Sequence, residues 1–176
     1  MTFTALWLAL SLPALGGSSG EELRHEAEKA LNNLNSADSA LTNFFENSAG
    51  YAVFPSVRRS GVNLTGEPVR GIVYEKGKPV GEAALAEKDV GRQDSAGPFH
   101  EVIFFETAEA LDNLKQGRFV KSADINPVAA AEGAALTAKY REGVIVFVIP
   151  KSGLMEAVSL GDQKFSYQPQ EQRKER

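Results

Sequence analysis

The chain contains no cysteine. This absence excludes disulfide bonds, thiolate zinc sites and cysteine nucleophiles. It also excludes a lipoprotein anchor, which needs a cysteine directly after the cleavage site. Only two histidines are present, His25 and His100, and neither has another histidine at ligand spacing. The sequence therefore indicates no metal, no cofactor and no catalytic constellation, and we expect a protein that is not an enzyme.

The chain also has no excess of positively charged residues. The formal net charge of the 176 residues is -4, so nothing indicates general nucleic-acid binding. The glycines form neither a GxGxxG nor a Walker pattern, which argues against a nucleotide loop. With 43% hydrophobic and 24% charged residues, the composition is that of one globular domain with a real core.

No apolar run is long enough to cross a bilayer, which requires about 20 residues. The longest candidate, residues 5–15, is interrupted by Ser11 and Pro13. Ala14 and Gly16 place small residues where a signal peptidase cleaves. We therefore expect residues 1–16 to be a signal peptide, residues 17–20 a linker, and the protein to be exported, periplasmic or secreted. An uncleaved apolar arm is the alternative.

Helical spacing follows the predicted linker. Ser19 and Glu22 have the spacing of a capping box, which predicts a helix start. Apolar residues then recur at helical spacing at Leu23, Ala27, Leu31 and Leu34. A second short helix is predicted around Ala37, Leu41, Phe44 and Phe45. Together the two helices are typical of an amphipathic lid over a sheet.

Extended segments begin after Gly50. Predicted strands cover residues 51–57, 69–74, 80–85, 99–106, 144–149 and 163–167, with a hairpin turn at 76–79. Thr107 is an N-cap candidate for a helix that Gly117 ends. Residues 127–140 are compatible with helix or strand, because their alanines favour helix whereas Pro127 and Gly133 interrupt it.

The fold class that these elements predict is α+β. The expected architecture is a curved antiparallel sheet, open or closed into a barrel, with N-terminal helices and one internal helix. Glycine is frequent from Gly61 to Gly97, where it predicts bulges or close backbone approach in a strongly curved sheet. Residues 21–169 form the predicted domain, and residues 170–176 form a polar tail.

Four ordered motifs carry a family resemblance. They are residues 47–55 (NSAGYAVFP), 71–81 (GIVYEKGKPVG), 102–119 (VIFF through KQGRF) and 153–167 (GLM through QKFSY). Over residues 31–169 the chain resembles the SYLF lipid-binding domain family, also known as an actin-binding domain of yeast actin-patch proteins. The resemblance implies a non-enzymatic protein that binds phospholipid or phosphoinositide at a membrane. The alternative it implies is a protein-interaction module, by analogy with the actin-linked members.

Two groups of residues are candidates for lipid contact. The first is a basic rim for lipid phosphate, formed by Arg58, Arg59, Arg70, Lys76 and Lys78, with a solvated loop as the alternative. The second is an aromatic set that forms either the core or an acyl-chain pocket: Phe99, Phe104, Phe105, Phe119, Phe147 and Phe165. Glu101 and Glu106 flank an apolar strand and are expected at its exposed edge.

Overall fold

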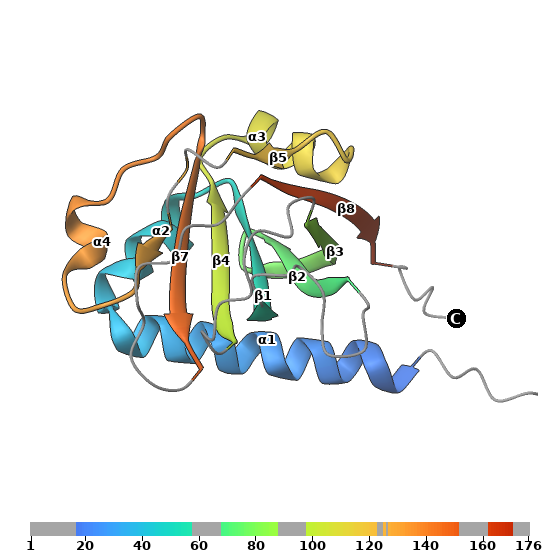
Figure 1. The fold of residues 1–176 in the computed structure, drawn as a ribbon, viewed down its shortest axis with the longest axis horizontal. Coiled ribbons are helices and arrows are strands. Elements are labelled where there is room, and N and C mark those ends of the chain that lie inside the picture. The colour runs from blue at the N-terminus through green and yellow to red at the C-terminus, as the bar shows by residue number, and fades with distance from the viewer. Residues whose placement is uncertain are drawn as a thin grey trace, which may run out of the picture.

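The computed structural model describes residues 17–57, 68–87, 98–122, 125, 127–151 and 162–170 (Figure 1). The helical elements are α1 (Gly17–Ala37), the 3-10 turn η1 (Ser39–Leu41), α2 (Thr42–Asn47), α3 (Ala108–Lys115) and α4 (Ala134–Thr137). The strands are β1 (Gly50–Val57), β2 (Val69–Glu75), β3 (Lys78–Glu87), β4 (Phe99–Phe105), β5 (Val120–Lys121), β6 (Val128–Ala129), β7 (Val144–Pro150) and β8 (Gln163–Pro169). The predicted α+β class is confirmed.

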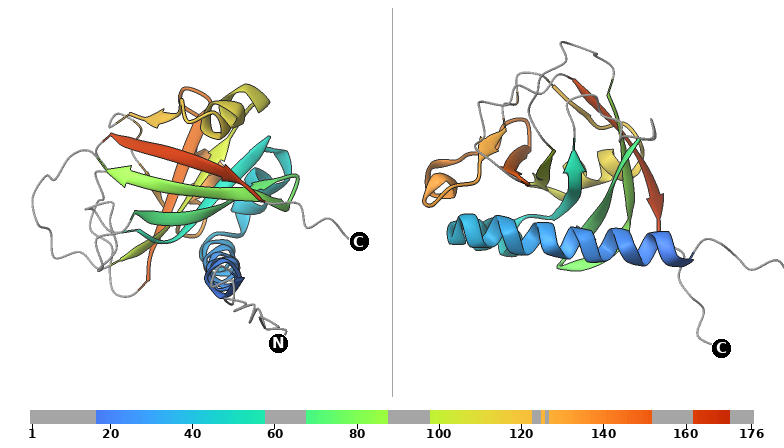
Figure 2. Two further views of the ribbon diagram at one scale, coloured as in Figure 1. Left: turned by 90° about the vertical axis from the view of Figure 1, so that its right-hand side faces the viewer. Right: turned by 60° about the horizontal axis from the view of Figure 1, so that its bottom comes forward.

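All eight strands belong to one sheet with the order β5-β8-β3-β2-β1-β4-β7-β6. Every pairing is antiparallel except that of β6 with β7, which is parallel, so the sheet is mixed. The sheet curls into a half-barrel, with β8 and β3 turned toward the viewer in the left panel of Figure 2. The predicted hairpin is β2–β3, and its Lys76 and Gly77 have φ of 51° and 74°, as a tight hairpin turn requires.

The two faces of the sheet bury separate apolar cores. Residues alternate between the faces along each strand, since successive side chains of a strand point to opposite sides. On β1, Ala52 and Phe54 belong to the concave interior, whereas Tyr51 and Val53 belong to the face covered by helices. The near-complete burial of β1, β4 and β7 follows from this double coverage.

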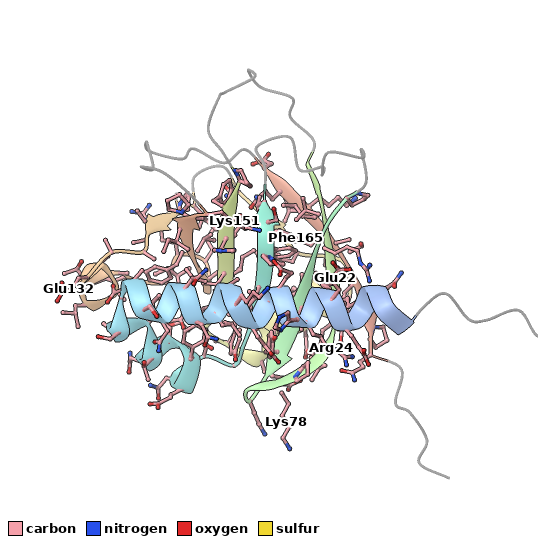
Figure 3. The ribbon with its side chains drawn as sticks, turned by 90° about the horizontal axis from the view of Figure 1, so that it is seen from below. Glu22, Arg24, Lys78, Glu132, Lys151 and Phe165 are labelled. Carbon is pink, nitrogen blue, oxygen red and sulfur yellow. The ribbon has the colours of Figure 1, made fainter. Side chains whose placement is uncertain are left out.

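The helix-covered face is packed by α1 and α2. Helix α1 contacts β1, β2, β4 and β7, and it crosses the sheet as seen from below in Figure 3. Its fully buried residues Ala27, Ala30 and Leu34 recur at helical spacing, and the two small alanines allow close approach to the strands. The predicted helical lid is therefore present.

Helix α3 packs against one end of the half-barrel through Leu111 and Leu114, which join the interior core. Its start is the predicted N-cap, since the Ala110 backbone N–H donates to Thr107 Oγ1 at 3.2 Å. Close backbone approach explains a glycine in the curved wall, because a Cβ on Gly71 would lie 2.5 Å from the Val53 carbonyl oxygen.

Two predictions about the elements need correction. Residues 17–20, predicted as a linker, are the first turn of α1, and this turn lies over the sheet, with a Cβ on Gly20 3.7 Å from Glu82 Oε1. Two internal helices are described rather than one, because α4 follows α3. The ambiguous residues 127–140 contain both states, a two-residue strand and a one-turn helix. Residues 1–16 and 171–176 lie outside the described residues.

Candidate functional site

The structure does not gather the described members of the predicted basic rim. Arg70 lies on β2, where its guanidinium forms an ion pair with Glu82. Lys76 and Lys78 lie at the β2–β3 turn, which projects away from the body of the protein in Figure 3. Six residues of strand separate Arg70 from Lys76, a distance of about 20 Å. Arg58 and Arg59 lie outside the described residues.

The predicted aromatic set divides between the two faces. Phe99, Phe105, Phe119 and Phe165 belong to the interior, and Phe104 and Phe147 to the helix-covered face. Interior rings contact one another, with centroids 5.3 Å apart for Phe105–Phe119 and 5.4 Å for Phe119–Phe165. These aromatic residues are core, as the first of the two interpretations expected, and we do not propose an acyl-chain pocket between them.

Polar side chains are buried inside the half-barrel. Glu101, Lys121 and Gln163 are each at most 1% exposed. The Gln163 Nε2 donates to Glu101 Oε2 at 3.5 Å, which joins β8 to β4 across the curl of the sheet. The Lys121 Nζ donates to the Ile125 carbonyl at 3.2 Å, and Glu101 and Lys121 each make a further interaction.

The prediction that Glu101 lies at an exposed edge is therefore wrong. Strand β4 has β1 on one side and β7 on the other, so it is a central strand of the sheet. Glu101 shares the inward face of β4 with Ile103 and Phe105. Glu106, which follows the end of β4, is exposed as expected.

His100 connects the sheet to α1. Its Nδ1 lies 2.6 Å from the Pro55 carbonyl oxygen, and since that oxygen can only accept, Nδ1 carries the proton. The Nε2 of the neutral ring then accepts from Asn33 Nδ2 on α1, 3.2 Å away. Burial is the main cause that lowers the pKa of His100 below its usual value of 6.5, and the positive charge of Lys151 adds to it.

This environment predicts a stability that depends on pH. Because the folded state lowers the pKa of His100, the unfolded chain binds the proton more readily. The stabilisation is therefore complete above pH 6.5 and is lost as the pH falls below 6.5 through the folded pKa. We expect His100→Gln to reduce the pH dependence of the free energy of unfolding, measured by urea denaturation at about pH 7.5 and 5.5.

His25→Gln is the matched control, since His25 is exposed on α1. It should leave the pH dependence of the wild type in place. A His100→Gln protein that loses as much stability on acidification as the wild type would show that His100 does not cause the effect.

The described side chains of helix α1 form no free apolar face for a membrane. Its apolar residues are packed on the sheet, and Glu21, Glu22 and Glu28 are exposed. An anionic membrane would repel this acidic surface. Helix α1 is therefore a poor candidate for membrane contact in this fold.

A groove at the β7 side of the sheet combines apolar and basic residues. We call it the edge groove; its volume is about 410 Å³, and it is lined by Ile125, Pro127, Val128, Thr137, Lys139, Arg141, Val144, Ile145 and Val146. None of these described lining residues is acidic. Lys139 and Arg141 are both exposed, so they can meet an anionic ligand.

Strand pairing creates the edge groove. The short β6 pairs with only Phe147 and Val148, so it leaves the start of β7 beside the segment that follows α4. That segment is held by reciprocal backbone hydrogen bonds between Arg141 and Val144, at 2.8 and 3.0 Å. The side chain of Arg141 is not needed for these bonds. Sequence reasoning missed the groove because its residues converge only through the parallel pairing of β6 with β7.

Within the described ranges, no cluster of three or more potential ligand side chains could hold a metal ion. Among the described helices, none has both the length and the apolar character needed to cross a bilayer. Comparison of the chain with models of protein families and with curated proteins finds no match.

Proposed function

We propose that this protein is a non-enzymatic lipid-binding protein that associates with phospholipid at a membrane surface. The observation that carries the proposal is the edge groove, whose lining combines the partly exposed Pro127 and Val128 with Lys139 and Arg141 and has no acidic residue among those described. The resemblance of residues 31–169 to the SYLF family supports the same function.

The chemistry of the edge groove fits an amphiphile. The accessible apolar surface of the groove comes mainly from the half-buried Pro127 and Val128, since Ile125, Val144, Ile145 and Val146 are each at most 5% exposed. Contact of an acyl chain with this surface removes hydrocarbon from water, which stabilises binding by about 25 cal/mol per Å² of apolar surface buried. The guanidinium of Arg141 suits bidentate contact with phosphate, and Lys139 adds a second positive charge. Each cation near an anionic membrane contributes about 1 kcal/mol. Arg58 and Arg59 remain candidates for additional phosphate contact.

Vesicle binding tests this function. We expect the wild type to co-sediment with anionic phospholipid vesicles at low salt and to dissociate as salt rises, because the Debye length is about 10 Å at 0.1 M. The double change Lys139→Gln, Arg141→Gln should weaken binding by roughly tenfold or more, since it removes two cations. The Arg58→Glu, Arg59→Glu protein is expected to bind anionic vesicles more weakly as well.

The control is Lys76→Gln, Lys78→Gln, which removes the same charge at the exposed hairpin turn. It should bind vesicles like the wild type, and all three double variants should melt like the wild type. A wild type that fails to sediment with any vesicle would refute the lipid function and favour the protein-interaction alternative. Binding that is unchanged in the edge-groove variant would place the lipid site elsewhere.

We further propose that the protein is exported to the periplasm or outside the cell, since residues 1–16 resemble a cleaved signal peptide. The expected mature chain begins near Gly17. Intact-mass measurement of the protein from its native source checks this. Retention of Met1 would contradict export by cleavage.

A further inference from the structure

A second groove lies toward the other end of the strand order from the edge groove, over β2, β3 and β8. Its volume is about 350 Å³, and its lining includes Arg70, Glu82, Ala84, Ser166 and Gln168. We call it the outer groove. It is distinct from the edge groove, with which it shares no lining residue.

The outer groove is open because of how the sheet is covered. Helix α1 packs on β1, β2, β4 and β7, and the outward residues of β8, Ser166 and Gln168, remain exposed. Ala84 pairs with Arg70 on β2 and with Ser166 on β8, so its small side chain leaves room between these two, and Glu82 pairs directly with Gln168. Polar groups from three strands therefore border one hollow.

Two opposite charges border the hollow. Arg70 pairs in register with Ala84 and Glu82 with Ile72, so Arg70 and Glu82 are diagonal neighbours on the outward face. Their side chains form an ion pair while remaining 46% and 28% exposed, respectively. A guanidinium has five N–H donors, and a carboxylate has about four acceptor positions, so each group can bind further partners.

We propose that the outer groove binds a zwitterionic ligand in which a phosphate and a primary ammonium are close together, as in a phosphoethanolamine group. The phosphate accepts from Arg70 and from the hydroxyl of Ser166, and the ammonium donates to Glu82. A ligand with phosphate alone meets the carboxylate of Glu82, and like charges repel. A quaternary ammonium has no N–H to donate. The charge pair therefore selects the zwitterion.

The inference is tested with the purified protein and sn-glycero-3-phosphoethanolamine, followed by two-dimensional amide NMR. We expect saturable shifts at Ala84, Ser166 and Gln168. The probe sn-glycero-3-phosphate, which lacks the ammonium, should bind about fivefold more weakly, the size of change that one partly exposed charge contact produces. Glu82→Gln should remove this difference, and Arg70→Gln should weaken both probes.

Two controls separate this site from other effects. Lys78→Gln, at the hairpin turn, should leave both affinities unchanged, as should the edge-groove change Lys139→Gln, Arg141→Gln. Melting curves should show that the Arg70 and Glu82 variants remain folded. Absence of shifts in the outer groove, or discrimination between the probes that survives Glu82→Gln, would overturn the inference.

Binding to vesicles distinguishes a lipid headgroup from a free soluble ligand. If the group belongs to a lipid, phosphatidylethanolamine added to phosphatidylcholine vesicles should increase binding, and Glu82→Gln should cancel the increase. If the soluble probe binds and the vesicles show no such increase, the site is supported and the ligand is free. Either result is independent of whether the edge-groove variant loses binding to anionic vesicles.

Discussion

Replacing Asp38 with alanine is expected to destabilise the fold by about 3–5 kcal/mol. The Asp38 carboxylate is 2% exposed and accepts three backbone N–H bonds. It caps η1 through Ala40 at 3.1 Å, and it binds Gly133 at 3.3 Å and Ala135 at 2.7 Å beside α4. The change would leave these donors without their acceptor in a buried site. It would therefore loosen α4, which precedes the edge groove.

Urea denaturation of Asp38→Ala and Asp38→Asn checks this expectation. The asparagine keeps one acceptor oxygen, so its loss of stability should be smaller, about 1–2 kcal/mol. An alanine variant within about 1 kcal/mol of the wild type would show that Asp38 does not tie the two segments together.

The second large effect is expected for Phe104→Ala, which should lower the free energy of unfolding by about 3–5 kcal/mol. Phe104 is 0% exposed at the centre of the helix-covered face. Its ring centroid lies 4.9 Å from that of Phe45, 5.5 Å from that of Phe44 and 5.6 Å from that of Tyr51. Truncation removes these contacts and leaves a cavity between α2 and the sheet.

Thermal melting measures this effect, with Phe104→Leu as the variant that keeps most of the volume. Leu136→Ala is the surface control, since Leu136 is 77% exposed, and it should melt like the wild type. An unchanged melting temperature in Phe104→Ala would contradict the packing described for this face.

The long elements could be predicted from the sequence because their periodicity is strong. The strands that carry Phe104 and Phe147 were both predicted, and both residues are buried where β4 pairs with β7. The Thr107 cap and the hairpin at Gly77 were also predicted correctly, since each depends on local chemistry. Local signals thus define most of the sheet and its covering helices.

Features that depend on distant contacts could not be predicted in this way. The burial of Glu101 follows from a partner, Gln163, that lies 62 positions away in the chain. Strand β6 and helix α4 are too short to show a period, so residues 127–140 stayed ambiguous. The basic rim was inferred from cations close in sequence, but extended strands carry Arg70 and Lys78 to opposite ends of a hairpin.

The edge groove changes where lipid contact is expected. From the sequence, we predicted lipid contact at the arginines after β1 and at aromatic rings. The edge groove instead contains Lys139 and Arg141, beside a β7 strand that β6 pairs with over only two residues. Two cations separated by one residue are unremarkable in a sequence. They become a candidate binding site only because β6 pairs in parallel with β7 and places apolar residues beside them.

Native mass spectrometry of the protein purified from cells tests the central claim most directly. We expect a folded species that carries the mass of a bound phospholipid, and less of this species in the Lys139→Gln, Arg141→Gln protein than in the Lys76→Gln, Lys78→Gln control. A wild type that is lipid-free after gentle purification, and that takes up no phospholipid from added vesicles, would contradict the account.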